Sequence, residues 1–207
     1  MKLILLGAPA SGKGTLSRDL RKKYDIPAIS TGDIIRENIQ AKTKLGKICN
    51  EYISNGNLVP DELIIELVKD RLKQADVSNG YILDGFPRTI NQAVALNEIE
   101  NITKVIYLDA SFDVILERSL SRRICPNCKK IYNTSKYALE HCEDCNEKLI
   151  LRDDDNEMTT KRRFDVFEAQ TKPLIKFYDD LGLLIKVDAN LDSNTVFECV
   201  VDILERK

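Results

Sequence analysis

A glycine-rich segment that directly follows a short apolar run is the feature that most constrains how this chain can fold. Leu3–Leu6 are apolar, and residues 7–15 read Gly-Ala-Pro-Ala-Ser-Gly-Lys-Gly-Thr. A strand, such a loop and a following helix form a phosphate cradle, because backbone N–H groups and the positive end of the helix point at the same oxygens. A glycine turn with an exposed lysine is the plainer alternative. The segment therefore predicts a strand–loop–helix unit that binds phosphate.

The residues of this loop are the first candidate ligands. Lys13 is placed to reach the β- and γ-phosphates, and the Thr15 hydroxyl to lie near Mg²⁺. The general pattern Gly-x4-Gly-Lys-[Ser/Thr] has a hydroxyl directly after the lysine, where this chain has Gly14. The candidates are Gly7, Ala8, Pro9, Ala10, Ser11, Gly12, Lys13, Gly14 and Thr15.

Apolar runs alternate with longer helical patterns along the rest of the chain. With 207 residues, of which 43% are hydrophobic, the chain can bury one sizeable core. The predicted strands are Leu3–Leu6, Ala28–Ser30, Tyr81–Leu83, Val105–Leu108 and Leu184–Val187. The predicted helices span residues 14–24, 61–73, 89–97, 112–123, 159–181 and 194–206. Strands separated by helices form right-handed crossovers, so the predicted fold is α/β, a parallel sheet with helices on both faces.

Charge and hydropathy argue against two classes of partner. The net charge is −2 and the pI is near 5.6, so we do not expect nucleic acid to be held by bulk electrostatics. The apolar run after Met1 and Lys2 is too short for the core of a signal peptide. No later run approaches the length that spans a bilayer. We therefore expect a cytoplasmic protein with no membrane or nucleic-acid partner.

Four of the six cysteines form two pairs, Cys125-x-x-Cys128 and Cys142-x-x-Cys145, separated by thirteen residues. Two such knuckles place four thiolates around one Zn²⁺ in a closed tetrahedral site, which suits a structural metal. Few apolar residues lie between the pairs, so the metal is expected to supply most of the free energy that orders this segment. Disulfides or another metal are the alternatives, and a cytoplasmic setting disfavours disulfides.

Four arginines bracket the cysteine segment: Arg118 and Arg122 precede it, and Arg152 and Arg163 follow it. Planar guanidinium groups donate paired hydrogen bonds to phosphate oxygens and stabilise the charge of a transferring phosphoryl group. A solvated helix face with ion pairs is the alternative. The phosphate loop in the same chain favours a polyphosphate clamp.

Five short motifs occur together in this chain. They are the loop at 7–15, Ser-Thr-Gly-Asp-x-x-Arg at 30–36, Leu-Val-Pro-Asp-Glu at 58–62, Leu-Asp-Gly-Phe-Pro-Arg-Thr at 83–89 and Arg-Asp-Asp-Asp at 152–155. In this combination the chain resembles the adenylate kinase family, in its long-lid, zinc-bearing bacterial form, over essentially its whole length. The resemblance implies a P-loop core of residues 1–29, 60–121 and 153–207, a helical insert at 30–59 that binds the nucleoside monophosphate, and a lid at 122–152 with the four-cysteine zinc site. It also implies a monomer that transfers the γ-phosphoryl group of MgATP to AMP, giving two ADP.

The resemblance assigns roles residue by residue. It implies AMP binding by Thr31, Arg36, Asn57, Leu58, Val59, Gly85, Arg88, Gln92, Arg152 and Arg163. It implies ATP binding by residues 7–15, Arg118 and Arg122, and a water-mediated Mg²⁺ contact by Asp84. The implied catalytic residues are Lys13, Arg88, Arg122, Arg152 and Arg163. Asp154 and Asp155 are similar to the lid-hinge carboxylates of the family.

Two of these roles have local alternatives. The Gln92 amide offers a donor and an acceptor to an adenine edge, but Thr89-x-x-Gln92 also fits a capping box, in which Gln92 folds back on its own helix. Asp84 precedes Gly85, so it can equally be a turn-forming residue.

Three residues depart from the family pattern. Ala10 and Lys129 stand where glycine is usual, and Asn133 stands where histidine is frequent. Alanine fits the phosphate loop if its φ is negative. We expect the two lid changes to bear on the geometry of the zinc knuckles and on lid dynamics, with Asn133 a polar partner for the lid backbone.

The mechanism follows from these parts. In-line transfer to AMP needs no covalent intermediate and no general base, because the acceptor is already an anionic phosphate. A kinase for UMP or CMP is the nearer alternative; Gln92 and the long lid favour AMP. A nucleotide-gated zinc-knuckle module that binds nucleic acid is the alternative of a different class, but the positive charge of residues 121–150 is small for that task.

Overall fold

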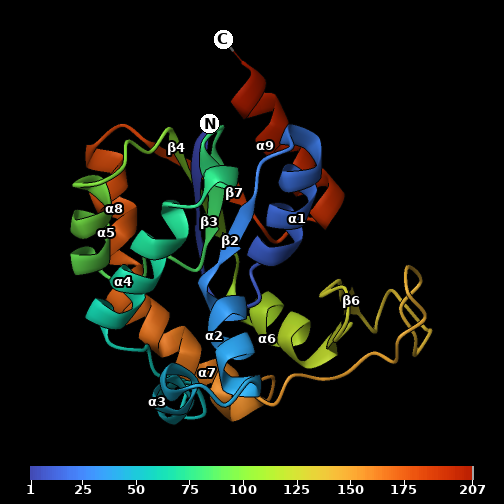
Figure 1. The fold of residues 1–207 in the computed structure, drawn as a ribbon. Helices are drawn as coiled ribbons and strands as arrows, with labels where there is room; N and C mark the ends of the chain where they lie inside the picture. Colours follow the sequence, from blue (N-terminus) through green and yellow to red (C-terminus); the bar gives the residue numbers. More distant parts are fainter. Residues whose placement is uncertain (207) are drawn as a thin grey trace.

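The central element is a parallel sheet. In the computed structural model, which describes residues 1–206, five strands form it in the order β2-β3-β1-β4-β7 (Figure 1). Their bounds are β1 Lys2–Gly7, β2 Ala28–Ser30, β3 Tyr81–Asp84, β4 Lys104–Asp109 and β7 Leu184–Asp188. Each neighbouring pair is parallel, which confirms the predicted α/β class.

Helices cover both faces of the sheet. Figure 1 shows α1 (Lys13–Tyr24) and α9 (Ser193–Glu205) on one side, and α4 (Asp61–Leu72), α5 (Ile90–Asn97) and α8 (Pro173–Asp180) on the other. Successive side chains of a strand point to opposite faces, so Leu3 and Leu5 pack under α1 and α9 while Ile4 and Leu6 join the opposite core. Burying each such side chain stabilises the fold by about 2 kcal/mol. The short helix η1 (Ala75–Val77) leads into β3. None of the helices in residues 1–206 is long and apolar enough to cross a membrane.

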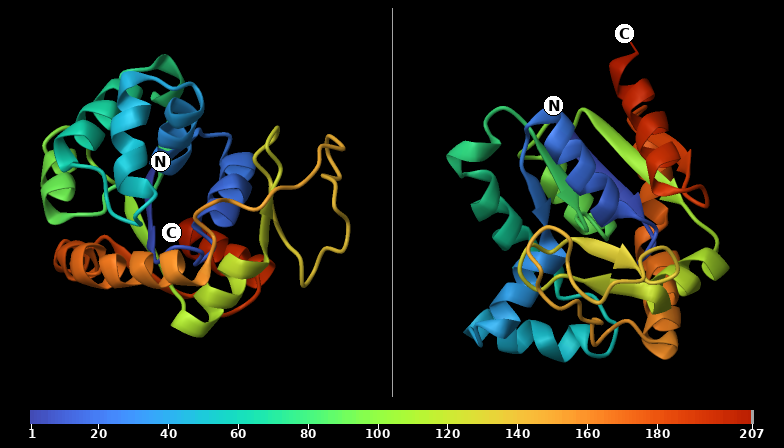
Figure 2. Two further views of the ribbon diagram at one scale, coloured as in Figure 1. Left: turned by 90° about the horizontal axis from the view of Figure 1, so that it is seen from below. Right: turned by 90° about the vertical axis from the view of Figure 1, so that its right-hand side faces the viewer.

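Two helices follow β2 and form a projection from the core (Figure 2). They are α2 (Thr31–Gln40), capped by the Ser30 hydroxyl, and α3 (Lys44–Ile53), capped by the Thr43 hydroxyl. A Cβ at Gly46 would lie 2.1 Å from the Asn38 carbonyl oxygen, so glycine permits the close approach of the two helices. These are the residues that the resemblance assigns to the insert, although the division into three parts stays a prediction.

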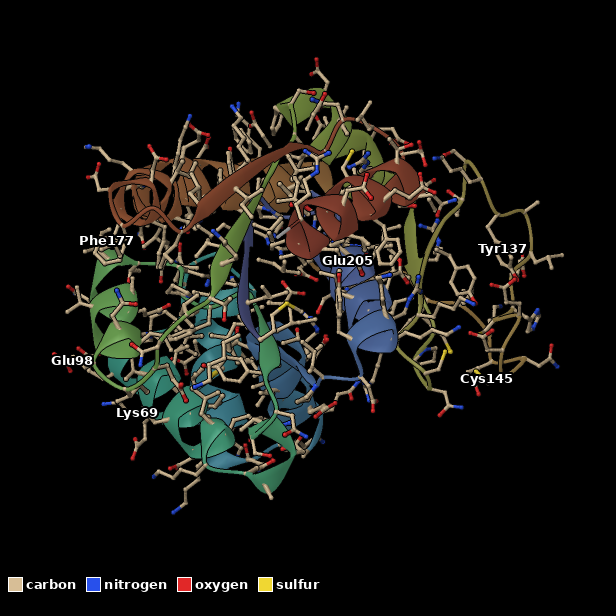
Figure 3. The ribbon with its side chains drawn as sticks, turned by 90° about the horizontal axis from the view of Figure 1, so that it is seen from above. Lys69, Glu98, Tyr137, Cys145, Phe177 and Glu205 are labelled. Carbon is tan, nitrogen blue, oxygen red and sulfur yellow. The ribbon has the colours of Figure 1, made fainter. Side chains whose placement is uncertain are left out.

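The predicted helix over 112–123 is two residues too long. Helix α6 (Phe112–Ser121) ends where Arg122–Ile124 become strand β5, which pairs antiparallel with β6 (Ile131–Asn133). The backbone groups of β5 bond to β6 rather than continuing the helix, a long-range choice that helical periodicity does not reveal. Beyond this ribbon the cysteine segment extends from the core; Figure 3 places Tyr137 and Cys145 on the side of the molecule opposite Glu98 and Phe177.

The predicted helix over 159–181 is interrupted. It begins two residues earlier, as α7 (Glu157–Val166) with Asn156 as its cap, passes through a π-helical turn, η2 (Phe167–Thr171), and continues as α8. Proline cannot donate a backbone hydrogen bond and its ring crowds the preceding turn, so Pro173 fits at the first position of α8. The other predicted helices and strands agree with the structure to within about two residues, a normal scatter for element ends.

Candidate functional site

One large cavity, of about 720 Å³, lies at the edge of the sheet where the strands end. Residues of the phosphate loop, the α2–α3 projection, the 84–92 segment, the β5–β6 ribbon and the 152–163 segment line it together. Among the nucleotide-site residues predicted above, Ala8 is the exception: it is buried beneath the loop and does not line the cavity. Parallel sheets bind ligands at this edge, so the cavity is the candidate active site.

The phosphate loop closes around its own lysine. The Lys13 ammonium donates to the carbonyl oxygens of Gly7 (2.7 Å) and Ala8 (2.8 Å), which draws the start of α1 back onto the end of β1. Gly7 has a φ of 149°, and a Cβ there would lie 2.6 Å from the Ser11 hydroxyl oxygen. These contacts hold the loop in one conformation. The Ser11 hydroxyl is buried in the loop with no partner among the described residues.

The condition set for Ala10 is not met. Its φ is +61°, in the left-handed region that glycine adopts freely and alanine does not. The loop geometry is thus kept at a cost of about 1 kcal/mol rather than relaxed into another conformation.

Gly14, the departure from the general loop pattern, is explained by the lid. A Cβ at this position would lie 3.2 Å from the Cδ1 atom of Ile131, on β6, and 3.7 Å from a carboxylate oxygen of Asp84. The absence of a side chain lets the ribbon pack against the first turn of α1.

Cations crowd the centre of the cavity. They outnumber the carboxylates beside them; the cations are Lys13, Arg36, Arg88, Arg122, Arg152 and Arg163, and the carboxylates are Asp33, Asp84, Asp154 and Asp155. Burial, reinforced by neighbouring arginines, lowers the pKa of Lys13 to about 8 and those of Arg88 and Arg152 to about 10. Arginine stays charged in proteins, so these shifts measure how unfavourable the uncompensated charge is. Such a site attracts a polyanion.

Ion pairs hold three of these arginines. Arg122 donates two hydrogen bonds to Asp155, which is also bonded to the Ser119 hydroxyl (3.3 Å), and Arg163 donates to Asp154 at 2.7 Å. Arg36 donates to Asp33 at 2.6 Å. Neighbouring arginines outweigh the effect of burial on Asp154, so its pKa lies below the ordinary value.

Arg152 and Arg118 differ in how they are held. The Nε atom of Arg152 is buried without a partner among the residues described, so it retains a donor for an incoming oxygen. Arg118 instead donates to the carbonyl oxygens of Ala189 (2.7 Å) and Leu191 (2.9 Å), which ties α6 to the end of β7 while the side chain still lines the cavity.

A second part of the predicted site lies at the end of β3. The Thr31 hydroxyl (2.8 Å) and the Arg88 Nε atom (2.8 Å) both donate to the Gly85 carbonyl oxygen. Gly85 has a φ of +80°, and a Cβ there would lie 2.8 Å from the Arg88 guanidinium. The Thr171 hydroxyl of η2 donates to the Arg88 carbonyl oxygen at 2.9 Å, so the π-helical turn helps to fix this segment.

Gln92 is buried, and both ends of its amide are engaged. Its Oε1 atom accepts from the Arg88 N–H (2.7 Å), and its Nε2 atom donates to Asp61 (2.7 Å). The Thr89 hydroxyl caps the helix at the Gln92 N–H, so a variant of the local capping alternative is present. Gln92 also lines the cavity, so the capping contact leaves base recognition open as a proposal.

Asp84 lies at the end of β3, beside Lys13 and the start of α1. Burial raises its pKa, an effect that Lys13 and Arg88 partly oppose. Asp84 and Thr15 both line the cavity, and their carboxylate and hydroxyl are oxygen ligands of the kind that Mg²⁺ prefers, so the residues fit this ion.

The four predicted zinc ligands lie together in the lid. Their sulfur atoms are all within 4.8 Å of one another, with Cys125 and Cys145 3.3 Å apart and Cys128 and Cys142 3.5 Å apart. Tetrahedral zinc–thiolate sites have sulfurs about 3.8 Å apart, whereas a disulfide needs about 2 Å. The six cysteines are free thiols in the described chain, so the donor set fits zinc and not disulfides.

The two knuckles are alike, which accounts for Lys129. The residue after each second cysteine, Lys129 (φ +62°) or Asn146 (φ +56°), is left-handed and donates its N–H to the carbonyl of the first cysteine. Lys129 therefore has a left-handed conformation, which glycine adopts more readily than lysine. Asn133 is a partner for the lid backbone, as predicted, because its Oδ1 atom accepts from the Ser135 N–H at 2.8 Å.

Several residues in or beside the cavity were given no role from the sequence. Ile131, Lys136 and Tyr137 line it from the lid, and Asp33 and Asp61 orient site residues from the α2 and α4 starts. Asp33 and Asp61 lie inside the motifs at 30–36 and 58–62, so those motifs could have pointed to them. No motif or spacing in the sequence marks the three lid residues as part of the cavity.

The low pKa of Lys13 gives a testable result. ATP brings phosphate charge to the ammonium and raises its pKa, so binding near pH 8 should take up about half a proton per site. The bound state then holds more protons than the free state, and ATP affinity should fall as the pH rises through 8. Titration calorimetry in two buffers of different ionisation enthalpy measures this uptake. If ATP binding took up no protons at pH 8 in the wild-type protein, the assignment of Lys13 as a phosphate ligand with a lowered pKa would be wrong.

Comparisons with known proteins agree with this geometry. The model of the adenylate kinase family matches residues 5–183. An adenylate kinase of Kosmotoga olearia is 44% identical over 213 residues, covering 99% of both chains. One of Lachnospira eligens is 45% identical over 212 residues, covering 99% of this chain and all of the relative, and one of Caldicellulosiruptor bescii is 48% identical over 193 residues, covering 89% and 90%. The chain therefore belongs to the adenylate kinase family.

Proposed function

We propose that the cavity carries out the reversible transfer of the γ-phosphoryl group of MgATP to AMP, giving two molecules of ADP. As a member of this family the protein is a phosphotransferase. One observation carries the assignment of the site: the phosphate loop and the Arg36–Arg88 region open into the same cavity, with an excess of cations between them. A donor and an acceptor phosphate can therefore meet there.

The residues divide between the two substrates. Gly7, residues 9–15, Arg118 and Arg122 bind ATP, while Arg36 and Arg88 neutralise the AMP phosphate, with Thr31 and residues 57–59 beside it. Arg152 and Arg163 face the region between the substrates. Asp84 and Thr15 would hold Mg²⁺, which when bound neutralises phosphate charge and helps to orient ATP.

Catalysis is then positioning plus charge stabilisation. Arg36, Arg122 and Arg163 are already held by Asp33, Asp155 and Asp154, so little reorganisation is needed to present them to phosphate oxygens. The acceptor is an anion and needs no general base. Closure of the lid over the loop excludes water, which strengthens the charge interactions and suppresses hydrolysis of ATP.

The same proposal extends to the state of the protein in the cell. Four thiols that must stay reduced to hold zinc suit a cytoplasmic setting. We propose a monomer with structural Zn²⁺ in its lid, which light scattering of the purified protein checks.

The test is to mix the protein with MgATP and each nucleoside monophosphate in turn and to follow diphosphate formation by anion-exchange chromatography. We expect ADP to form fastest with AMP and not to form without an acceptor. Faster transfer to UMP or CMP would contradict the choice of AMP while keeping the mechanism. No transfer to any acceptor would contradict the proposed reaction.

A further inference from the structure

Asp61 joins two helices through both of its carboxylate oxygens. It is the first residue of α4, and its Oδ1 atom accepts from the Gln92 Nε2 atom at 2.7 Å. Its Oδ2 atom accepts from the Thr89 hydroxyl, also at 2.7 Å. That hydroxyl in turn accepts from the Gln92 N–H at 3.2 Å. Asp61, Thr89 and Gln92 therefore form a closed ring of hydrogen bonds.

This ring determines which way the Gln92 amide points. The Arg88 N–H can only donate, so the amide end that faces it must be the oxygen. A carboxylate can only accept, so the end that faces Asp61 must be the nitrogen. Reversing the amide would bring two donors together at one end and two acceptors at the other. With Gln92 only 2% exposed, water cannot compensate for either mismatch.

The fixed amide retains one hydrogen on Nε2 and one lone pair on Oε1. Gln92 lines the cavity, so a nucleobase bound against it would meet these two groups. A 6-amino purine presents an accepting N1 and a donating amino group, which match them. A 6-oxo purine presents a donating N1 and an accepting oxygen, which do not match unless the amide reverses.

We infer that Asp61 is a positioning residue that holds the Gln92 amide in the orientation selecting 6-amino over 6-oxo purine monophosphates. This inference rests on the proposed function, because it requires the acceptor base to lie against Gln92. It gives Asp61 a role in specificity in addition to its place at the start of α4.

The test compares Asp61→Ala with Asp61→Asn, which keeps an oxygen that can accept from Nε2. Glu62→Ala is the matched control, since Glu62 is exposed in the same first turn of α4 and removes the same charge. For each variant we would measure KM and kcat with AMP and with inosine monophosphate, KM for ATP, and the thermal midpoint. If Asp61→Ala only loosened the start of α4, the kinetic constants for ATP and for both monophosphates would change together. If it released the Gln92 amide, only the discrimination between the two monophosphates would change.

We expect Asp61→Ala to raise KM for AMP about tenfold and to lower the preference for AMP over inosine monophosphate by about the same factor, with KM for ATP unchanged. Asp61→Asn should restore most of the wild-type KM for AMP and most of the preference for AMP over inosine monophosphate. An Asp61→Ala protein within twofold of wild type in both quantities would overturn the inference, as would an Asp61→Asn protein as impaired as Asp61→Ala.

A measurement on the wild-type protein covers the case in which Asp61→Ala does not fold. In the side-chain amide NMR spectrum, one Gln92 Nε2 hydrogen should be protected from exchange by its bond to Asp61. Exchange of both hydrogens at the rate of a free amide would overturn the inference. If the wild-type enzyme prefers a monophosphate other than AMP, the proposed function is wrong. If the wild-type enzyme selects AMP but the Asp61 variants behave like it, the proposed function stands and only this inference is wrong.

Discussion

Replacing Arg88 with alanine is expected to lower kcat about a thousandfold while leaving the protein folded. Arg88 lies in the cavity beside Arg163 and Arg36, where burial and those cations lower its pKa to about 10. Asp84 and Asp154 offset this effect only in part, so a bound phosphate would compensate the Arg88 charge further. Steady-state kinetics and thermal unfolding of the Arg88→Ala protein measure the two effects.

The thermal midpoint distinguishes this role from a structural one. Because the substitution removes a cation from a crowded cationic site, the midpoint should stay within a few degrees of wild type or rise. Arg71→Ala is the control: Arg71 pairs with Asp76 on the surface, away from the cavity, and its loss should leave kcat unchanged. Near-normal kcat and KM in Arg88→Ala would remove Arg88 from the catalytic set.

Removing the lid metal is expected to unfold residues 122–152 and leave the core folded. The apolar cluster of this segment consists of Cys125, Tyr132, Cys142 and Leu149, with Tyr137 packed against it, which is too little to order some thirty residues. Zinc bound to such a site supplies on the order of 10 kcal/mol toward folding. After chelation, hydrogen exchange should lose protection in the lid, the thermal midpoint should fall, and ATP analogues should still bind the phosphate loop.

Two substitutions separate the metal site from general thiol effects. Cys142→Ser removes a buried ligand and should reproduce the effects of chelation, whereas Cys199→Ser, on the exposed face of α9, should change nothing. Elemental analysis of protein purified without chelator should find about one zinc per chain. Absence of metal, together with six titratable thiols, would refute the zinc assignment.

Much of the fold was predictable because its signals are local. Strands β1, β3 and β4 carry continuous apolar runs, and the helix caps at Thr89 and Asn156 are short polar side chains bonded three residues ahead. Two features differ from what the sequence suggested. Arg122–Ile124 continue a helical pattern in sequence but pair with the distant strand β6. Ala10 lies in a local turn, closed by the bond from the Ser11 N–H to the Ala8 carbonyl oxygen, and has the left-handed φ of a glycine.

The phosphate loop, the two cysteine knuckles and the α/β class could be predicted before folding, since each depends on residue spacing within a few turns of backbone or on the alternation of apolar runs. Three features became visible only in the folded chain: which carboxylate pairs with which arginine, how closely Ile131 approaches Gly14, and which way the Gln92 amide points. Those features depend on Asp155, Ile131 and Asp61, which reach their partners only once the chain has packed. Hydrogen bonds and contacts between distant segments leave no period in the sequence, because their geometry is set by the packing of whole elements.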